Sequence, residues 1–353
     1  MHTDKQTRNF PLRNSLTLLL TAFICAPSVA MLLFVGGCDR TGPGGEVVVV
    51  YTSVDDPVAR PVLAEFTRRT GIQVETRTDT EADKSAGLAA RLEAERREPR
   101  ADVWWGNEVF RTIRLADAGV LAPYESPSAK DVPPLFKDPS HLWTGSALRV
   151  RVIGVHRDPK KPGAKYLPND SLEDLLRPEL KGRVAIADPR AGTTSGHVAA
   201  LYVLWGEEKA RQFFRGLREN DVKVLGGNAN VTTEVGNGTL WAGLTDNDDV
   251  DATARAGGAI EARLPDQKTI GTLTIPCTAA LVAGAKHPEA AKKLIDYLLS
   301  ADVERKLIDA QFAGWSVRAS ANEIRTMDVD YRDVAKALPD AVETAMTILE
   351  GRE

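Results

Sequence analysis

A dense group of carboxylates marks one short segment in the second half of this 353-residue chain. Asp246, Asp248, Asp249 and Asp251 crowd one predicted loop after a strand, and negative charges so close repel one another. The segment therefore needs either a bound cation or cationic ligand, or full exposure to water. Carboxylate oxygens bind hard metal ions and also accept hydrogen bonds from organic ligands. The spacing is not that of an EF-hand, which has a glycine at its sharp turn and a closing glutamate.

A second candidate site is the run Thr193-Thr194-Ser195-Gly196, which precedes a predicted helix. Backbone N–H groups at a helix start, together with the helix dipole, bind anions. Hydroxyl side chains at such positions also serve as ordinary N-caps, and this explanation suffices unless an anion is bound. The next residue, His197, is expected on the helix surface, with a position facing the site as the alternative.

Polar side chains also follow predicted strands at several places along the chain. In open α/β sheets, ligands bind at the carboxyl ends of the strands, so we expect these side chains to meet around one ligand. The candidate ligand-binding residues are Ser53, Asp55, Asn107, Glu108, Thr193, Thr194, Ser195 and Asp246, and the candidate metal ligands are Asp248 and Asp249.

Alternating strands and helices must position these residues. Val47–Val50 is a continuous β-branched run that is typical of a buried strand, and it begins a series of strand–helix units. Two longer strands interrupt the series near 146–156 and 268–282. The pattern predicts an α/β fold of two lobes joined by crossing strands, each lobe a mixed sheet flanked by helices. The predicted division is 46–150 plus 275–320 for lobe one and 151–274 plus 321–353 for lobe two.

The N-terminal segment indicates export. Basic residues precede an uncharged, mostly apolar run of 24 residues, Asn14–Gly37, and the run ends at Val35-Gly36-Gly37-Cys38. A cysteine directly after small residues is typical of a lipoprotein signal. We therefore expect a signal peptide at 1–37, a lipid on Cys38 and a tether at 38–45. An uncleaved membrane helix is the alternative. Both place the following chain in the periplasm or at the cell surface, held at a membrane.

Composition excludes several classes of function. The formal net charge is −4 and no basic stripe appears, which argues against a nucleic-acid partner. Cys277 is the lone cysteine after Cys38, so no intramolecular disulfide is expected in the exported chain, and its apolar neighbours indicate a buried thiol. The chain has no nucleophile elbow and no zinc-protease motif, so an enzyme is not expected. We expect a monomer without a catalytic cofactor.

Motifs spread over nearly the whole exported chain resemble the substrate-binding proteins of bacterial ABC importers, specifically the ferric-iron-binding group. They are Val49–Ser53, Thr70-Gly71, Ala101–Val103, Ala118–Pro123, Gly182–Pro189, Gly243–Asp246, Ala291–Ser300 and Ser316–Arg318. The resemblance implies a type II periplasmic-binding-protein clamshell that binds a small ligand. It also implies a permease and an ATPase as partners.

The ligand residues depart from the ferric pattern. Asp55 is nearest to the position of a histidine, and Asn107, with Glu108 beside it, matches a glutamate. Asp248 and Asp249 replace the paired tyrosines that mark the group. The resemblance therefore implies Fe³⁺ or another hard cation, held with or without a bound anion. The residues themselves leave open a sugar, a sugar phosphate or a polyamine, and a sensor that does not transport.

Overall fold

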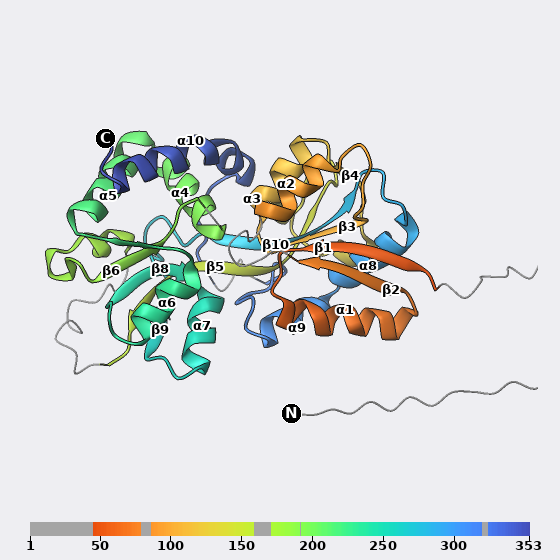
Figure 1. The fold of residues 1–353 in the computed structure, drawn as a ribbon, viewed down its shortest axis with the longest axis horizontal. Coiled ribbons are helices and arrows are strands. Elements are labelled where there is room, and N and C mark those ends of the chain that lie inside the picture. Colours follow the sequence, from red (N-terminus) through yellow and green to blue (C-terminus); the bar gives the residue numbers. More distant parts are fainter. Residues whose placement is uncertain (1–44, 79–85, 159–170, 191, 320–323) are drawn as a thin grey trace, which may run out of the picture. The chain divides into compact units, whose positions relative to one another are not determined.

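Strands and helices alternate along the chain in the computed structural model (Figure 1). The structure describes residues 45–78, 86–158, 171–190, 192–319 and 324–353. The predicted signal peptide and Cys38 lie outside these ranges. Among the helices of the described ranges, none is long and apolar enough to cross a membrane.

Within the described residues, ten strands pair in the order β2-β1-β3-β10-β5-β8-β6-β7, with β4 paired to β10 and β9 to β5. The strands are β1 (Val47–Thr52), β2 (Gln73–Thr78), β3 (Val103–Gly106), β4 (Leu121–Ala122), β5 (Thr144–His156), β6 (Val184–Ala187), β7 (Lys223–Leu225), β8 (Ala242–Asp246), β9 (Ile260–Arg263) and β10 (Thr274–Val282). Two parallel groups, β2-β1-β3 and β8-β6-β7, are thus joined by the antiparallel strands β10 and β5.

Helices follow most of the parallel strands, as crossover connections require. The α-helices are α1 (Asp56–Thr70), α2 (Ala86–Ala94), α3 (Val109–Asp117), α4 (Gly192–Trp205), α5 (Glu207–Glu219), α6 (Asn228–Gly236), α7 (Asn247–Arg255), α8 (Pro288–Leu298), α9 (Ala301–Asp309) and α10 (Tyr331–Leu349). Short 3₁₀ helices are η2 (Pro127–Ala129), η3 (Pro134–Phe136), η5 (Leu172–Leu176) and η6 (Pro178–Leu180). The predicted α/β class and the two blocks of strand–helix units are confirmed.

Strand β5 connects the two parallel groups because its hydrogen-bond partner changes along its length. Residues Thr144–Val150 pair with β10, whereas Arg151–His156 pair with β8 and β9. All thirteen residues of β5 are buried. The change of partner therefore falls between Val150 and Arg151, in the middle of a fully buried strand. The division of the chain into two lobes at these positions stays a prediction.

Apolar side chains from both faces of the sheet form the core. Trp104 and Trp105 follow each other on β3, so their side chains point to opposite faces, and both are fully buried. Helix α1 buries Val62 and Phe66 on one face and ends at Gly71, which adopts the left-handed conformation that favours glycine. Burying a side chain of this size contributes about 1.5–3 kcal/mol. The prediction that Cys277 is buried is confirmed.

Two local predictions of the helix starts are wrong. The acidic segment does not form a loop, because Asp246 is the N-cap of α7 and Asp248 and Asp249 lie in its first turn. Negative side chains at this position are stabilised by the positive end of the helix dipole, which explains why the segment folds this way. The residues Thr193–Ser195 likewise lie inside the first turn of α4 rather than before it.

Candidate functional site

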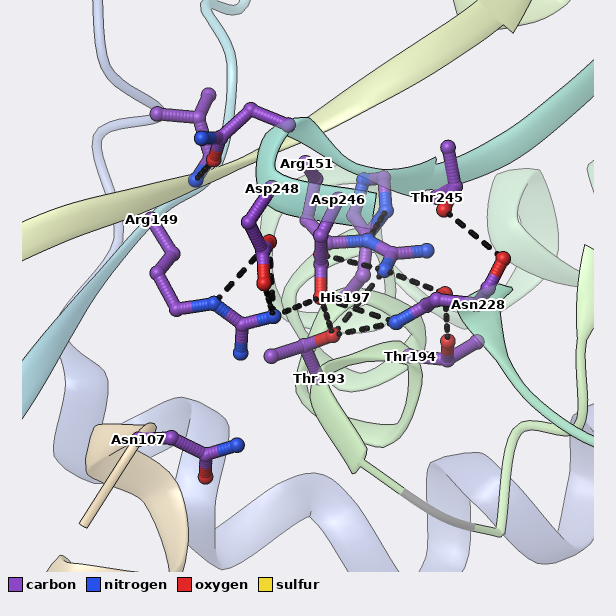
Figure 2. Close-up of polar contacts among 12 residues, drawn as sticks. Asn107, Arg149, Arg151, Thr193, Thr194, His197, Asn228, Thr245, Asp246 and Asp248 are labelled. Atoms are coloured by element: carbon purple, nitrogen blue, oxygen red, sulfur yellow. Dashed lines mark hydrogen bonds and ion pairs between the residues drawn. The ribbon is translucent and has the colours of Figure 1, made fainter. Parts of the chain in front are cut away.

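Two arginines on β5 organise the candidate site (Figure 2). Arg149 and Arg151 are two residues apart on one strand, so their side chains point to the same face. The side chain of Arg149 is 4% exposed and that of Arg151 is fully buried. A buried guanidinium requires carboxylate partners, because an unpaired charge inside a protein is strongly unfavourable. The partners come from the end of β8 and the start of α7.

Asp246 accepts hydrogen bonds from four side chains. Nη1 of Arg151 lies 2.7 Å from its Oδ1, and Nη2 of Arg149 lies 3.0 Å from its Oδ2. The hydroxyl of Thr193 and the amide of Asn228 donate to Oδ2 at 2.5 and 2.9 Å. Burial favours the neutral acid, but the charges of Arg151 and Arg149 outweigh it and hold the pKa of Asp246 below its ordinary value. Asp246 is therefore a buried anion whose bonds fix the surrounding elements.

Asp248 binds Arg149 through both carboxylate oxygens. Nη2 of Arg149 lies 2.9 Å from Oδ1 and 2.7 Å from Oδ2, and Nε lies 3.3 Å from Oδ1. Burial raises the pKa of Asp248 to about 6 although Arg149 opposes the shift, and the neighbouring charges of Asp246 and Asp55 add to the rise. The carboxylates of Asp246 and Asp248 thus share the guanidinium of Arg149.

The three carboxylates of Asp246, Asp248 and Asp249, hereafter the acidic group, meet the geometric requirement for a metal site. One ligand oxygen from each residue lies within 4.8 Å of the others. Asp246 and Asp248 are buried and Asp249 is partly buried, and the charge of Asp249 also acts on Arg149. The structure therefore brings together the two predicted metal ligands, Asp248 and Asp249, with Asp246 beside them.

The hydroxyl groups in the first turn of α4 are already engaged. Thr193 donates to Asp246 and accepts from Nη1 of Arg151 at 3.1 Å, and Thr194 donates to Oδ1 of Asn228 at 3.3 Å. Ser195 donates to the carbonyl of Gly192 at 2.7 Å. All three predicted residues are thus buried, and the hydroxyl of Thr193 joins the first turn of α4 directly to Asp246.

The expectation that His197 lies on the helix surface is wrong. Its side chain is buried, and its Nδ1 accepts a hydrogen bond from Nε of Arg151 at 3.3 Å. Burial and the adjacent charge of Arg151 lower the pKa of His197 well below its ordinary value, so the ring is neutral. The neutral imidazole thus holds the side chain of Arg151 in place by accepting its hydrogen bond.

Predicted residues from the other parallel group lie near the acidic group. Ser53, after β1, donates to Oδ1 of Asn107 at 2.9 Å, and the backbone N–H of Asn107 donates back to the Ser53 hydroxyl at 2.9 Å. Asp55 is close enough for its charge to raise the pKa of Asp248. Figure 2 shows the side chain of Asn107 on the side toward which one end of the Arg149 guanidinium points.

Glu108 has a structural role at the start of α3. It is the N-cap residue, and its carboxylate accepts from the backbone N–H groups of Phe110 at 2.7 Å and Arg111 at 3.1 Å. The side chain is buried, and burial raises its pKa although these bonds oppose the shift. Its oxygens hold α3 in place, and they lie close enough to Arg149 for its charge to act on them.

Sequence reasoning missed Arg149, Arg151 and Asn228. Asn228, at the start of α6, accepts from Nη1 of Arg151 at 3.1 Å and donates to Asp246. The available signal was the alternation of arginine with valine over β5. Two arginines at strand spacing within an apolar segment indicate one buried face that carries charge and needs acidic partners.

This combination of fold and site defines a class of protein. The family model for bacterial extracellular solute-binding proteins matches residues 47–312, so the chain belongs to that family. Members of this non-enzymatic class bind small ligands and serve ABC importers. The type II clamshell fold implied by the sequence is confirmed through its match to ferric binding protein structures.

Within this family, the chain is similar to the following three proteins. The major ferric iron-binding protein of Neisseria meningitidis serogroup B is 27% identical over 289 residues, 79% of this chain and 84% of the relative. A putative 2-aminoethylphosphonate-binding periplasmic protein of Salmonella typhimurium is 25% identical over 278 residues, 77% of each chain. The ferric binding protein from Campylobacter jejuni has the same fold, with a TM-score of 0.75, 19% identity and coverage of 85% of this chain and 99% of that protein. The chain is thus a distant relative of the ferric-iron-binding periplasmic proteins.

Proposed function

We propose that the protein is an exported receptor that binds a small polar solute at the acidic group and delivers it to the permease and ATPase of an ABC importer. The observation that carries this proposal is the convergence of the two parallel groups on one place. Gly196 near the start of α4, which follows β6, packs against the ring of Phe110 on α3, which follows β3. The charge of Asp55, after β1, also acts on Asp248, after β8. A ligand that contacts both would stabilise the arrangement in which they lie together.

The residues favour a polar organic solute, such as a sugar or a sugar phosphate. Arg149 and Arg151 already neutralise much of the acidic group, which lowers its need for a metal ion. Ser53, Asp55 and Asn107 would contact the solute from one side and the first turns of α4 and α7 from the other.

A hard cation, Fe³⁺ in particular, is the second candidate ligand. Three carboxylate oxygens within 4.8 Å of one another and the relationship to ferric iron-binding proteins favour it. Asp248 and Asp249 would be its ligands, and an anion at the first turn of α4 would complete the coordination. A polyamine would also suit the carboxylates. A sensor that binds without transport is the remaining alternative, and neighbouring genes for a permease and an ATPase would argue against it.

We further propose that the receptor is a monomer anchored through a lipid on Cys38, in the periplasm or at the cell surface. Two or more acyl chains on one protein anchor it stably to a membrane. The tether at 38–45 would then separate the binding body from the bilayer. The importer in the same membrane would meet the receptor at a high local concentration.

A thermal-shift screen tests the receptor function. The purified protein is heated with metal ions, oxyanions, sugars, sugar phosphates and polyamines in turn. A ligand at 100 times its Kd should add about 2.7 kcal/mol of stability. Asp248→Ala and Asp249→Ala should remove the shift produced by the ligand, whereas Asp302→Ala, at a partly exposed ion pair on α9, serves as the control. A shift that survives both substitutions would place the ligand elsewhere.

A further inference from the structure

We propose that Arg149 determines which class of ligand this site binds. Its guanidinium is a built-in cation that occupies the acidic group and excludes a bare metal ion. One N–H₂ group of the same guanidinium donates to an oxygen atom of an organic solute. This inference rests on the proposed function and deepens it. It assigns a specificity role to a residue that the motif comparison with the ferric group did not mark.

The position of one nitrogen atom carries the first part of the argument. Nη2 of Arg149 lies 3.0 Å from Oδ2 of Asp246 and 2.9 and 2.7 Å from the two oxygens of Asp248. These two residues supply two of the three carboxylates that could hold a metal. The nitrogen thus lies among the oxygens that a metal ion would need, and it already satisfies their demand for positive charge.

Arg149 is also held in place from two other directions. Its backbone pairs with Ile275 in the β5–β10 ladder. Its guanidinium carbon lies 5.3 Å from the centre of the Phe312 ring, within range of a cation–π contact. A metal ion would have to displace a buried cation from between an aromatic ring and two carboxylates. It would then remain close to that cation, which is unfavourable for a multivalent ion.

The other terminal nitrogen carries the second part of the argument. Nε and Nη2 of Arg149 make the hydrogen bonds described above, whereas Nη1 makes none with the described residues and is not sealed from solvent. Figure 2 shows this end of the guanidinium pointing away from the acidic group, toward the side on which Asn107 lies. A side chain that is 4% exposed thus keeps one N–H₂ group that donates to none of the described residues.

A guanidinium N–H₂ group only donates hydrogen bonds, so its ligand must present an acceptor. Hydroxyl, carboxylate and phosphate oxygens meet this requirement, whereas a metal ion and the ammonium groups of a polyamine do not. The nearby carboxylates of Asp55 and Asp249 suit the O–H or N–H groups of the same solute. The geometry therefore selects a sugar or sugar phosphate over an ion or a polyamine.

Terbium binding to variants of Arg149 tests the exclusion of metal. Tb³⁺ is a hard trivalent probe whose luminescence is sensitised by tryptophan. We expect weak binding to the unmodified protein, at least tenfold tighter binding to Arg149→Met, and loss of this gain in Arg149→Met/Asp248→Asn. Arg60→Met, which removes an exposed arginine from Asp56, is the matched control. Tight Tb³⁺ binding to the unmodified protein, or no gain in Arg149→Met that melts cooperatively, would overturn the exclusion.

Arg149→Lys tests the acceptor requirement and guards against unfolding of the methionine variant. Lysine keeps a positive charge near the carboxylates but has no second N–H₂ group. We expect Arg149→Lys to bind Tb³⁺ as weakly as the unmodified protein and to bind the solute found by thermal shift at least tenfold more weakly. Unchanged solute affinity would remove Arg149 from ligand recognition while leaving the receptor function intact. If the protein is not a receptor for these ligands, no compound in the thermal-shift screen will stabilise it.

Discussion

Arg151 and Asp246 face each other across the β5–β8 ladder, and their charged groups meet at 2.7 Å with both side chains fully excluded from water. Cross-strand neighbours on one face of a sheet lie close enough to interact directly. This pair joins the strand that crosses between the two parallel groups to the start of α7. It therefore sets the position of the carboxylates that follow.

Breaking this pair should destabilise the fold. We expect Arg151→Met to lower the free energy of unfolding by about 3–5 kcal/mol, because it leaves a buried charge with fewer partners. Arg151→Met/Asp246→Leu should recover part of this loss. Urea unfolding measures both, and Arg60→Met at an exposed pair should change stability by less than about 1 kcal/mol. Equal losses of stability in Arg151→Met and Arg60→Met would contradict the stabilising role of the buried pair.

His197 should make stability depend on pH. Its folded-state pKa lies well below the ordinary value, so the unfolded chain binds a proton near pH 6.5 that the folded chain does not. Stability should therefore fall as the pH drops below about 6.5, by up to about 1.4 kcal/mol per pH unit.

His197→Asn removes this proton and keeps an oxygen that can accept from Arg151. We expect its unfolding free energy to decline less between pH 7 and pH 5 than that of the unmodified protein. His141→Asn, at an exposed position, provides the control. Parallel pH profiles for all three proteins would show that His197 does not contribute.

Gly196 permits close packing of α4 on α3. A methyl group at this position would overlap the ring of Phe110. We expect Gly196→Ala to lower stability by about 1–3 kcal/mol and to weaken solute binding, because the two helices follow strands of different parallel groups. Phe110→Leu in the same chain should restore part of both. Gly226→Ala has room for its methyl group, so indistinguishable behaviour of the two alanine variants would refute the prediction.

Glu108 and Asn107 are adjacent but should respond differently to substitution. Glu108→Ala removes the cap of α3 and should lower stability by about 1 kcal/mol. Asn107→Ala should weaken solute binding, since its side chain lies across from Arg149. Calorimetric titration and urea unfolding of both variants separate the two roles. A larger loss of affinity in Glu108→Ala would assign the ligand contact to the glutamate instead.

The lipid anchor is tested at Cys38. Cys38→Ser removes the thiol that would be acylated, so we expect the protein to leave the membrane fraction and its N-terminal peptide to lose the mass of the acyl chains. An uncleaved membrane helix would keep Cys38→Ser in the membrane fraction. Fractionation with mass spectrometry of the N-terminal peptide distinguishes these outcomes.

The fold could be predicted because its signals are local. The β-branched run at β1 and the alternation of arginine with valine over β5 each indicate a strand without reference to distant residues. Helix starts were less accurate, because a row of aspartates is typical of an exposed loop unless a helix dipole stabilises it. That stabilisation at α7 explains the error.

The site could be predicted only in part, because its decisive contacts join distant residues. Strand ends located Asp248 and Asn107, but nothing in the sequence pairs Arg149 with a carboxylate 99 positions away. The same limit explains the error at His197, a helix residue whose buried ring is hydrogen-bonded to Arg151 from strand β5. The spacing of residues along the chain indicates which face of a strand is buried. It does not indicate which distant residue will pair with a charge on that face.

The change of partner within β5 has a mechanical consequence. The backbone of Arg149 is paired with β10, whereas the next arginine along the strand is paired with β8. Torsion of the chain between them would change the distance from Arg149 to Asp248, because Asp248 follows β8. A bound solute and a rotation of the two parallel groups would therefore both act on the hydrogen bonds from Nη2 of Arg149 to Asp248.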